Sequence, residues 1–328
     1  MSGFAAQKLG DTTELEKLEP AWWALWRRCP SATPFQSPAW LIPWWRTFRP
    51  GPLFSFAVWR GSDLVGLAPF YLEDGALGRR LLPLGISLSD YLDVLIDPDD
   101  QDEVASALVS AASEAPDWER WELEDLREGA ASLSLPLPRC WAEENAAQQP
   151  CPCLSLDPED SLAQLPSRKR RNIRMSQNRA ERRGPLAYDA GEPVDLLFRE
   201  LVRLHTKNWA RRGGTGLLAS DTVLRFHDAA LLALYDADLL RLRAIRINGA
   251  MAAVQYALQH RGTCYLYLQG FDPEFDFESP GTILLARVIE QAVAEGCHEI
   301  DFLRGGEPYK YTWGAADRWT VKRSLIRQ

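Results

Sequence analysis

Residues 240–259 read LRLRAIRINGAMAAVQYALQ, and this stretch predicts a β-hairpin. Apolar residues fill most of two runs, Leu240–Ile247 and Met251–Gln259, with a composition that is typical of strands. Between the runs, Asn248-Gly249 is the strongest short hairpin signal because both residues tolerate a positive φ. A third strand is expected over Thr263–Gln269, so the region predicts an antiparallel meander.

Helical patterns surround this meander. Val194–Ala210 and Val223–Leu234 precede it and carry apolar residues at helical spacing. The loop Gly270–Pro280 follows it and leads to a helix expected from about Gly281 to Glu295. A last strand is expected over His298–Leu303. This order predicts an α/β (α+β) fold in which a mixed sheet is flanked by helices.

The first part of the chain shows a similar order of elements. A helix is expected to begin at Pro38. It is followed by two strands of a hairpin with a four-residue connection, then a strand, a helix and a last strand. Those five segments are Leu53–Trp59, Leu64–Leu72, Tyr91–Ile96, Val104–Ala112 and Trp118–Leu123. We infer a tandem duplication of one α/β unit.

Length and composition support two domains. The chain has 328 residues, 46% of them hydrophobic, so it can bury two cores of ordinary size. We expect an N-terminal domain over residues 1–160, a basic linker or helix over 161–185 and a C-terminal domain over 186–328. The N-terminal domain is expected to be noncatalytic, because its loop Leu81–Gly85 offers one glycine and no cation to a donor.

The sequence argues against several classes of protein. A net charge of −8 disfavours nucleic acid as the main partner. No run of about 18 apolar residues and no signal-peptide pattern occur, which predicts a cytoplasmic protein without a membrane span. The six cysteines are expected to be reduced, and the four histidines are too dispersed for a metal site. ATP and NAD are poorly supported because their glycine-rich motifs are missing.

One basic segment, Ser167–Arg183, qualifies the acidic balance. It contains eight Lys or Arg residues and one acid. Two interpretations stay open. The segment is a solvated helix that joins the two domains. Alternatively, it holds phosphate, either of a cofactor or of a nucleic acid such as tRNA.

The residues Ser279-Pro280-Gly281-Thr282 form a candidate anion site. Gly281 lets the backbone approach a ligand closely, and the first N–H groups of the following helix suit a pyrophosphate. The alternative is that these residues only start a helix. His205, on the apolar face of the helix Val194–Ala210, is either a buried core residue or a catalytic group.

The densest polar cluster follows the last expected strand. It runs from Asp301 to Gly314 and combines acids, cations, phenols and flexible backbone. Open α/β sheets place ligands at the ends of strands, so the cluster is a candidate active site. The alternative is an ordinary polar loop. Serine hydrolase chemistry is disfavoured because the chain lacks a Gly-x-Ser-x-Gly elbow.

The second half of the chain resembles the acetyltransferase domain of CelD-like, cellulose-biosynthesis-associated proteins in the GNAT superfamily. The residues that carry the resemblance are Leu204-His205, Trp209, Arg212-Gly213, Gly270-Phe271-Asp272-Pro273, Ser279-Pro280-Gly281, Asp301-Phe302-Leu303-Arg304-Gly305, Glu307, Tyr309-Lys310 and Trp313-Gly314. The first half is similar to the preceding segment of that family through Pro34–Trp40, Leu64–Pro69 and Ser89-Asp90-Tyr91. The resemblance implies a pair of GNAT-like folds.

The resemblance also implies an activity. It predicts transfer of an acetyl or other acyl group from acyl-CoA to an amine, with a saccharide or its precursor as acceptor in cellulose or exopolysaccharide synthesis. Related Fem-type peptidyltransferases use aminoacyl-tRNA instead, and tRNA would then bind the basic segment. A third alternative is a noncatalytic module that keeps the fold and recognises a saccharide or a partner.

The pattern and the resemblance together place the donor. The pantetheine arm is expected to pair with the strand Thr263–Gln269, and the pyrophosphate to meet the helix that starts at Gly281. The thioester then lies near Gln269 and Gly270, where backbone N–H groups stabilise the oxyanion. The expected donor-binding residues are Gln269, Gly270, Ser279, Pro280, Gly281, Thr282, Arg304 and Lys310.

Acid and base roles are assigned in the same way. A carboxylate, Asp301 or Glu307, is expected to accept a proton from the attacking amine. Tyr309 or Tyr311 is expected to protonate the departing thiolate. The expected catalytic residues are Asp301, Glu307, Tyr309 and His205, and no metal is expected.

Overall fold

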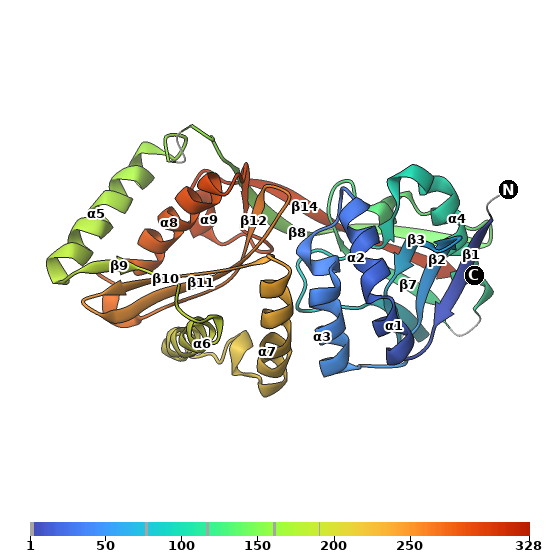
Figure 1. Ribbon diagram of the computed structural model, residues 1–328. Coiled ribbons are helices and arrows are strands. Elements are labelled where there is room, and N and C mark those ends of the chain that lie inside the picture. Colours follow the sequence, from blue (N-terminus) through green and yellow to red (C-terminus); the bar gives the residue numbers. More distant parts are fainter. Residues whose placement is uncertain (1–2, 76–77, 116–117, 160–161, 190) are drawn as a thin grey trace. The chain divides into compact units, whose positions relative to one another are not determined.

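The structure, a computed structural model, describes residues 3–75, 78–115, 118–159, 162–189 and 191–328 (Figure 1). The chain forms two compact units. The first unit contains residues 1–149 and 318–328, and the second unit contains residues 150–317. The sequence pattern assigned residues 318–328 to the C-terminal domain, whereas the structure places them with the first unit.

The helices and strands of the first unit are short. The helices are α1 (Thr12–Lys17), α2 (Glu19–Arg28), α3 (Pro38–Phe48) and α4 (Gln101–Glu114). The strands are β1 (Phe4–Leu9), β2 (Ser55–Arg60), β3 (Asp63–Ala68), β4 (Phe70–Gly75), β5 (Gly78–Pro83), β6 (Leu95–Ile96) and β7 (Arg120–Leu126), together with most of β14 (Ala316–Arg327). The long strand β8 (Trp141–Ser155) starts in this unit and ends in the second.

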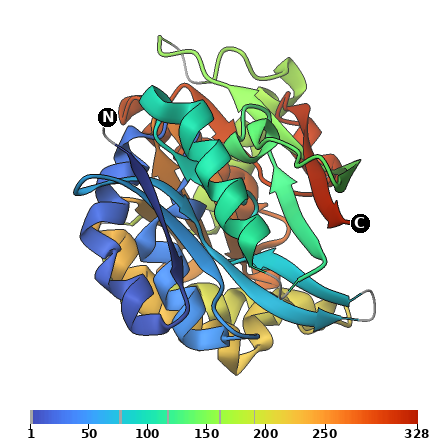
Figure 2. The ribbon, with the colours of Figure 1, turned by 90° about the vertical axis from the view of Figure 1, so that its right-hand side faces the viewer.

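The strands of the first unit form two groups. β1, β2, β3 and β6 pair antiparallel in this order, and α4 lies across this group of strands (Figure 2). β4 pairs with β5, β5 pairs in parallel with β7, and β7 pairs with β14. Leu325 of β14 is fully buried in the same core as Phe56, Phe70 and Trp121. This burial explains why the end of the chain packs with the first unit.

Two expectations for the first unit were wrong in detail. The expected strand Leu64–Leu72 is interrupted at Pro69, so β3 pairs with β2 while β4 pairs with β5. Proline has no backbone N–H to donate, and a strand changes partner easily at such a residue. The expected strand Tyr91–Ile96 is reduced to Leu95–Ile96, whose pairing with β3 involves only these two residues.

The second unit contains a sheet between two layers of helices. The helices are α5 (Ser167–Arg183), α6 (Val194–Arg211), α7 (Asp221–Asp236), α8 (Pro280–Ala294) and the short α9 (Pro308–Tyr311). The strands, besides the end of β8, are β9 (Leu186–Tyr188), β10 (Leu240–Ile247), β11 (Ala250–His260), β12 (Thr263–Phe271) and β13 (Glu299–Asp301). α6 and α7 cover one face, and α8 with α5 covers the other (Figure 1).

The expected meander is confirmed. The strand order is β8-β13-β12-β11-β10-β9, and only the β12–β13 pair is parallel among the pairs of this unit that the structure describes. Asn248 and Gly249 form the hairpin turn with φ values of 51° and 78°. The expected helices on both sides of the meander are also present, with ends that differ by a few residues.

Helix α5 belongs to the second unit and is not a linker between the two units. Its buried residues are Lys169, Ile173, Ser176 and Ala180, which are spaced so that they lie on one face of the helix. This face packs against α8. None of the helices in the described ranges is long and apolar enough to span a bilayer.

Candidate active site

Strands β12 and β13 separate in the middle of the second unit's sheet. Their parallel pairing covers only Thr263, Cys264 and Tyr265 of β12, and β13 ends at Asp301. β12 continues to Phe271 in antiparallel pairing with β11. The second half of β12 therefore extends past the end of its parallel neighbour, which is where the sequence analysis expected neighbouring strands to part.

A β-bulge lies at this point of β12. Tyr256 of β11 is opposite Leu268, whereas the next residue, Ala257, is opposite Leu266, so Tyr267 is the extra residue. Buried Gln255 fixes the bulge, because its Nε2 donates to the Leu268 carbonyl over 3.0 Å. Bulges increase the local twist and redirect side chains next to binding sites.

A pocket of about 660 Å³ opens beside the bulge. We call it the β12 pocket. β12, α6, α8, the start of α5 and the segment that follows β13 contribute its walls. Of the residues proposed from the sequence, His205, Gln269, Ser279, Pro280, Gly281, Thr282, Glu307 and Tyr309 line it. Gly270, Asp301, Arg304 and Lys310 are not among its lining residues.

Three polar atoms of the pocket walls are buried and unpaired. His205 Nδ1, Asn208 Oδ1 and Gln269 Nε2 have no hydrogen-bond partner among the described residues. His205 and Asn208 are each 5% exposed. A buried polar atom without a partner costs about 1–3 kcal/mol, so several in one pocket indicate a place for a ligand. Asn208 was not proposed as a site residue from the sequence, although it lies three residues from His205 on the same helix face.

His205 is held as a neutral side chain. Burial lowers the pKa of His205 below its usual range, so the imidazole is uncharged at neutral pH. Its ring lies 6.0 Å from that of Trp209, measured between centroids. Gly216 makes room for both rings, since a Cβ at this position would lie 2.5 Å from His205 Cε1 and its φ is 71°. A neutral imidazole with an unpaired nitrogen can accept a proton.

Gly270 has a structural role in the fold. A Cβ on this residue would lie 2.9 Å from the His205 backbone N and 2.9 Å from Leu204 Cβ. Helix α6 can pack closely on β12 only because Gly270 has no side chain. Gly270 was expected from the sequence to bind the donor, but a Cβ on this residue would face α6, and Gly270 is not among the residues that line the β12 pocket.

The start of α8 offers fewer free N–H groups than the sequence suggested. Ser279 adopts a left-handed conformation with φ 54°, and its side chain does not cap the helix. Pro280 has no N–H, and the Thr282 N–H donates to the Ser279 carbonyl over 3.0 Å. The start of α8, with the positive end of its dipole, still lines this part of the pocket through Pro280, Gly281 and Thr282.

The segment after β13 is held by Lys310. This side chain is only 4% exposed and donates to the carbonyls of Leu303, Arg304 and Gly305 over 3.0, 2.8 and 2.9 Å. Its Nζ also lies 2.9 Å from a Glu307 carboxylate oxygen. The three N–H groups of Lys310 are thus used inside the protein, which disfavours the expected role in holding donor phosphate.

Asp301 is likewise occupied with the backbone. It is 1% exposed, and its Oδ1 accepts the Leu303 N–H over 2.8 Å. This bond helps to hold Leu303 at a φ of 58°. Cys153, Glu299 and Asp301 bring three metal-ligand-type atoms within 4.8 Å of one another, but that cluster lies outside the β12 pocket. Asp301 is therefore less suited to proton transfer than the sequence suggested.

Glu307 and Tyr309 remain at the pocket. The Glu307 side chain is 56% exposed and pairs with Lys310. Partial burial and the neighbouring Glu307 carboxylate raise the pKa of Tyr309 to about 12. Tyr309 thus keeps its proton and can donate a hydrogen bond, but it is a weaker acid than an ordinary thiol with a pKa of about 8.5. Tyr311 donates to Asp317 over 2.7 Å and does not line the pocket.

Lys169 is a pocket residue that the sequence analysis did not single out. It comes from the first turn of α5, and its Nζ lies 3.8 Å from the centroid of the Trp313 ring. Nζ donates to Thr312 Oγ1 over 3.2 Å. Burial lowers the pKa of Lys169 to about 8. The spacing of Lys169 with Ile173, on the buried face of α5, was the signal that distinguished it from the neighbouring basic residues.

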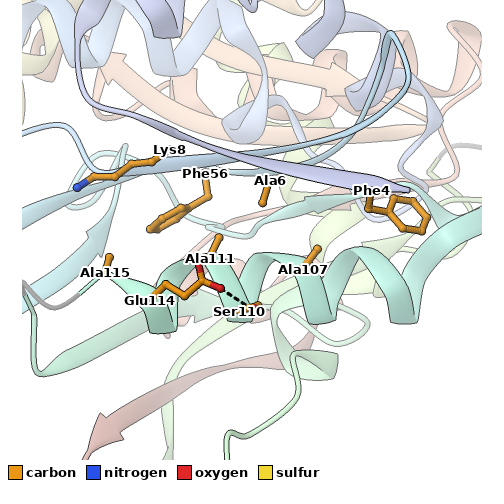
Figure 3. Close-up of a pocket in the computed structure, with 9 residues that line it drawn as sticks. All are labelled: Phe4, Ala6, Lys8, Phe56, Ala107, Ser110, Ala111, Glu114 and Ala115. Atoms are coloured by element: carbon orange, nitrogen blue, oxygen red, sulfur yellow. Dashed lines mark hydrogen bonds between the residues drawn. The ribbon is translucent and has the colours of Figure 1, made fainter. Parts of the chain in front are cut away.

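The first unit has a different kind of pocket (Figure 3). It has a volume of about 490 Å³ between β1, β2 and α4, and six of its nine lining residues are apolar. Figure 3 shows Lys8 at one end and Glu114, which accepts a hydrogen bond from Ser110, at the helix. Lys8 and Glu114 offer a cation and a carboxylate. Among the described residues, this pocket has no cluster of buried, unpaired polar atoms like that of the β12 pocket.

Comparisons with known proteins agree with this fold. Residues 167–311 match a family model described as the acetyltransferase (GNAT) domain. A crystal structure of FemX is similar with a TM-score of 0.68 and 11% identity, covering 99% of this chain and 97% of that one. A conserved protein of unknown function from Bacteroides thetaiotaomicron VPI-5482 has a TM-score of 0.60 and 12% identity, with both chains fully covered.

A further structure, L-PGS from Bacillus licheniformis, has a TM-score of 0.57 and 13% identity, covering 98% of this chain and 94% of that one. No curated protein matches the sequence. At these identities the structural likeness shows the fold alone. The expected fold class, with a mixed sheet flanked by helices and a GNAT domain in the second half, is confirmed.

Proposed function

We propose that the second unit transfers an acyl group from acyl-CoA to an amine. The observation that carries this proposal is the separation of β12 from β13 beside the β12 pocket, within the segment that matches a GNAT acetyltransferase domain. A strand that extends past its neighbour leaves backbone groups for an extended ligand, and a pantetheine arm with its amide groups suits such an edge. The adjoining pocket is large enough for a thioester and a small acceptor.

The donor lies along β12 in this proposal. The pantetheine arm follows Leu266–Gln269, and the pyrophosphate lies at the Gly281 N–H, where the dipole of α8 favours an anion. The thioester carbonyl lies beside the bulge at Tyr267, so that a backbone N–H of β12 can stabilise the developing oxyanion. Gln269 Nε2 supplies a further donor in the same wall.

The transfer step needs a base and a hydrogen-bond donor. The amine nitrogen attacks the thioester carbonyl, the carbon–sulfur bond breaks, and the amine proton passes to His205 Nδ1 or, through water, to Glu307. The CoA thiolate leaves with a hydrogen bond from Tyr309. No covalent acyl-enzyme is invoked. The buried Cys264 and Cys297 have pKa values raised by burial, so they are poor nucleophiles.

The acceptor class comes from the resemblance to CelD-like proteins. An amine of a saccharide or of its precursor is the acceptor that this resemblance supports, within cellulose or exopolysaccharide synthesis. The unpaired Asn208 Oδ1 offers an acceptor for an amine or hydroxyl hydrogen of such a compound.

The proposal is tested by acyl transfer with purified full-length protein. Release of free thiol from acetyl-CoA is followed with a panel of amines that includes amino sugars. We expect both Glu307→Gln and His205→Gln to lower turnover. The substitution that removes the catalytic base should lower turnover by about a hundredfold or more. Glu290→Gln, a change at a half-buried position of α8 that does not line the pocket, is the matched control and keeps full activity. No thiol release with any amine, although CoA binds, would indicate a noncatalytic module.

A second candidate function is transfer from an aminoacyl-tRNA. The specific observation behind it is an exposed face of α5 that carries Arg168, Arg171, Arg174 and Arg182. None of these four arginines has an ion-pair partner among the described residues, whereas Arg179 and Arg183 bind the loop before α8. The similarity to the FemX fold is compatible with this alternative.

The two candidates are separated by binding measurements. Total tRNA and acetyl-CoA are titrated into wild-type protein and into a variant with Arg168, Arg171 and Arg174 changed to Gln. Under the acyl-CoA proposal, acetyl-CoA binds both proteins equally and tRNA binds weakly. Tight tRNA binding that falls with rising salt and is lost in the variant supports the second candidate instead.

A further inference from the structure

Lys169 is a buried cation without a counter-ion. The residue is 9% exposed, and no carboxylate of the described chain lies within ion-pair distance of its Nζ. Its polar contact is the Thr312 hydroxyl at 3.2 Å, and the face of Trp313 lies on another side at 3.8 Å. An ammonium has three N–H donors, so two are available to a ligand.

The acidic groups of the β12 pocket are paired with other cations. Asp276 forms an ion pair with Arg211, and Glu307 pairs with Lys310 over 2.9 Å. Arg212, on the rim, lies 6.0 Å from the Trp209 ring. The pocket walls therefore hold more positive than negative charge, and the excess includes the buried Lys169.

Buried charges in proteins are normally paired, because an isolated ion loses its hydration. Stability of the fold alone would favour an apolar side chain at position 169, since Ile173 and Ala180 on the same face of α5 are buried and apolar. The first turn of α5 adds the positive end of its helix dipole to the charge of Lys169. Both effects favour an anion in the adjoining space.

We propose that Lys169 binds an anionic oxygen group of the substrate, a phosphate or a carboxylate, inside the β12 pocket. This inference rests on the proposed function for the identity of the substrates, although the anion site itself does not depend on catalysis. It also supplies the cation that the Ser279–Thr282 loop lacks in the sequence. The unpaired atoms of His205, Asn208 and Gln269 lie in the same pocket and orient the rest of the ligand.

The anion has two sources, the phosphate of the donor or a carboxylate of the acyl group or acceptor. Coenzyme A and pantetheine share the same arm but differ in phosphate. β-Alanine and propylamine are both small amines but differ in the carboxylate. Comparing the members of each pair identifies the source.

The test observes Lys169 directly in the full chain. Protein is labelled with ¹³C at lysine Cε, and the Lys169 signal is assigned from its loss in Lys169→Gln. In the free protein the signal should titrate with a midpoint near pH 8. A saturating anionic probe should raise the midpoint by at least about one pH unit, because a bound anion favours the charged form.

Affinity gives a second measurement. Lys169→Gln should weaken binding of coenzyme A or of β-alanine, the members that carry the phosphate or the carboxylate, by about tenfold or more, the scale of a hydrogen bond to a charged group. It should leave binding of the other member of that pair unchanged. Arg168→Gln is the matched control, since it removes the same charge from the neighbouring exposed position. This variant should bind all four probes like the wild type.

A shift with coenzyme A but not pantetheine supports the proposal with phosphate as the anion, and a shift with β-alanine but not propylamine supports it with a carboxylate. A Lys169 signal that does not move with coenzyme A or β-alanine overturns the proposal. Equal losses of affinity in Lys169→Gln and Arg168→Gln would also overturn it, because the effect would then be general electrostatics. Absence of acyl transfer with a normal Lys169 shift would instead count against the proposed function alone.

Discussion

Gly270 sets the distance between β12 and α6, and its replacement by alanine has a calculable effect. The new Cβ would lie 2.9 Å from the His205 N, 2.9 Å from Leu204 Cβ and 3.0 Å from the Leu201 carbonyl oxygen. Ordinary contacts between such atoms are about 3.5–4.0 Å, so α6 must move away by about 0.5–1 Å. The obstructing atoms are backbone atoms and a Cβ, which no rotamer change can remove.

This displacement affects both stability and the site. Overpacking of this kind costs about 1–3 kcal/mol, which corresponds to roughly 2–10 °C in Tm for a unit of this size. Helix α6 carries His205, Asn208 and Trp209 into the β12 pocket. Productive site geometry tolerates only about 0.5 Å, and a displacement of about 1 Å can lower turnover a hundredfold. We therefore expect Gly270→Ala to lower turnover by tenfold or more in protein that is still folded.

The assay combines thermal unfolding with thiol release from acetyl-CoA. Gly281→Ala is the matched control, because a Cβ there would lie 3.4 Å from the flexible end of Gln269 and alanine favours the helix. Gly281→Ala should have an unchanged or slightly raised Tm. Its affinity for the donor is the property that should change. If Gly270→Ala were as stable and active as the wild type, the steric reasoning for the α6–β12 contact would be refuted.

Three other substitutions test the charges of the second unit. Lys169→Met should have a higher free energy of unfolding than the wild type at pH 7, where the folded wild type contains the buried ammonium. This difference in unfolding free energy should become smaller by about 2 kcal/mol at pH 9.5. The wild type gains stability as the pH rises, because the pKa of Lys169 is lowered to about 8 in the folded protein, against about 10.4 in the unfolded protein. Urea unfolding at the two pH values measures it, and a pH-independent difference would contradict the burial of the charge. Asp301→Ala should destabilise the protein by about 1–3 kcal/mol through loss of the Leu303 N–H acceptor, whereas Glu307→Gln should leave Tm within about 1 °C and reduce turnover. Equal losses of Tm in both variants, measured by calorimetry, would contradict this division of roles.

The elements of the second unit could be predicted because their signals are local. Asn248-Gly249 specifies its own turn, and the apolar spacing of Val194–Ala210 and of the helix after Gly281 specifies which face is buried. Each of these patterns is complete within about 15 residues. The pairing of β14 with β7 joins residues 195 to 206 positions apart, and no local pattern contains that information.

The site was predictable only in part for the same reason. Glu307 and Tyr309 could be proposed because polar residues follow the last strand, and His205 because it interrupts an apolar face. The sequence could not tell that Lys310 is used by three backbone carbonyls, since that depends on how the turn before it folds. Lys169 was obscured by seven other basic residues in the same helix, and its spacing from Ile173 on the buried face is a weak signal beside them.

The proposed position of the donor is along the second half of β12 in the second unit. Backbone hydrogen exchange of the full chain, measured by mass spectrometry with and without coenzyme A, tests it most directly. Adding coenzyme A should slow exchange in peptides that cover Leu266–Phe271 and Ser279–Leu285, with no change in the first unit. Unchanged exchange along β12 at millimolar coenzyme A, or protection confined to the first unit, would contradict it.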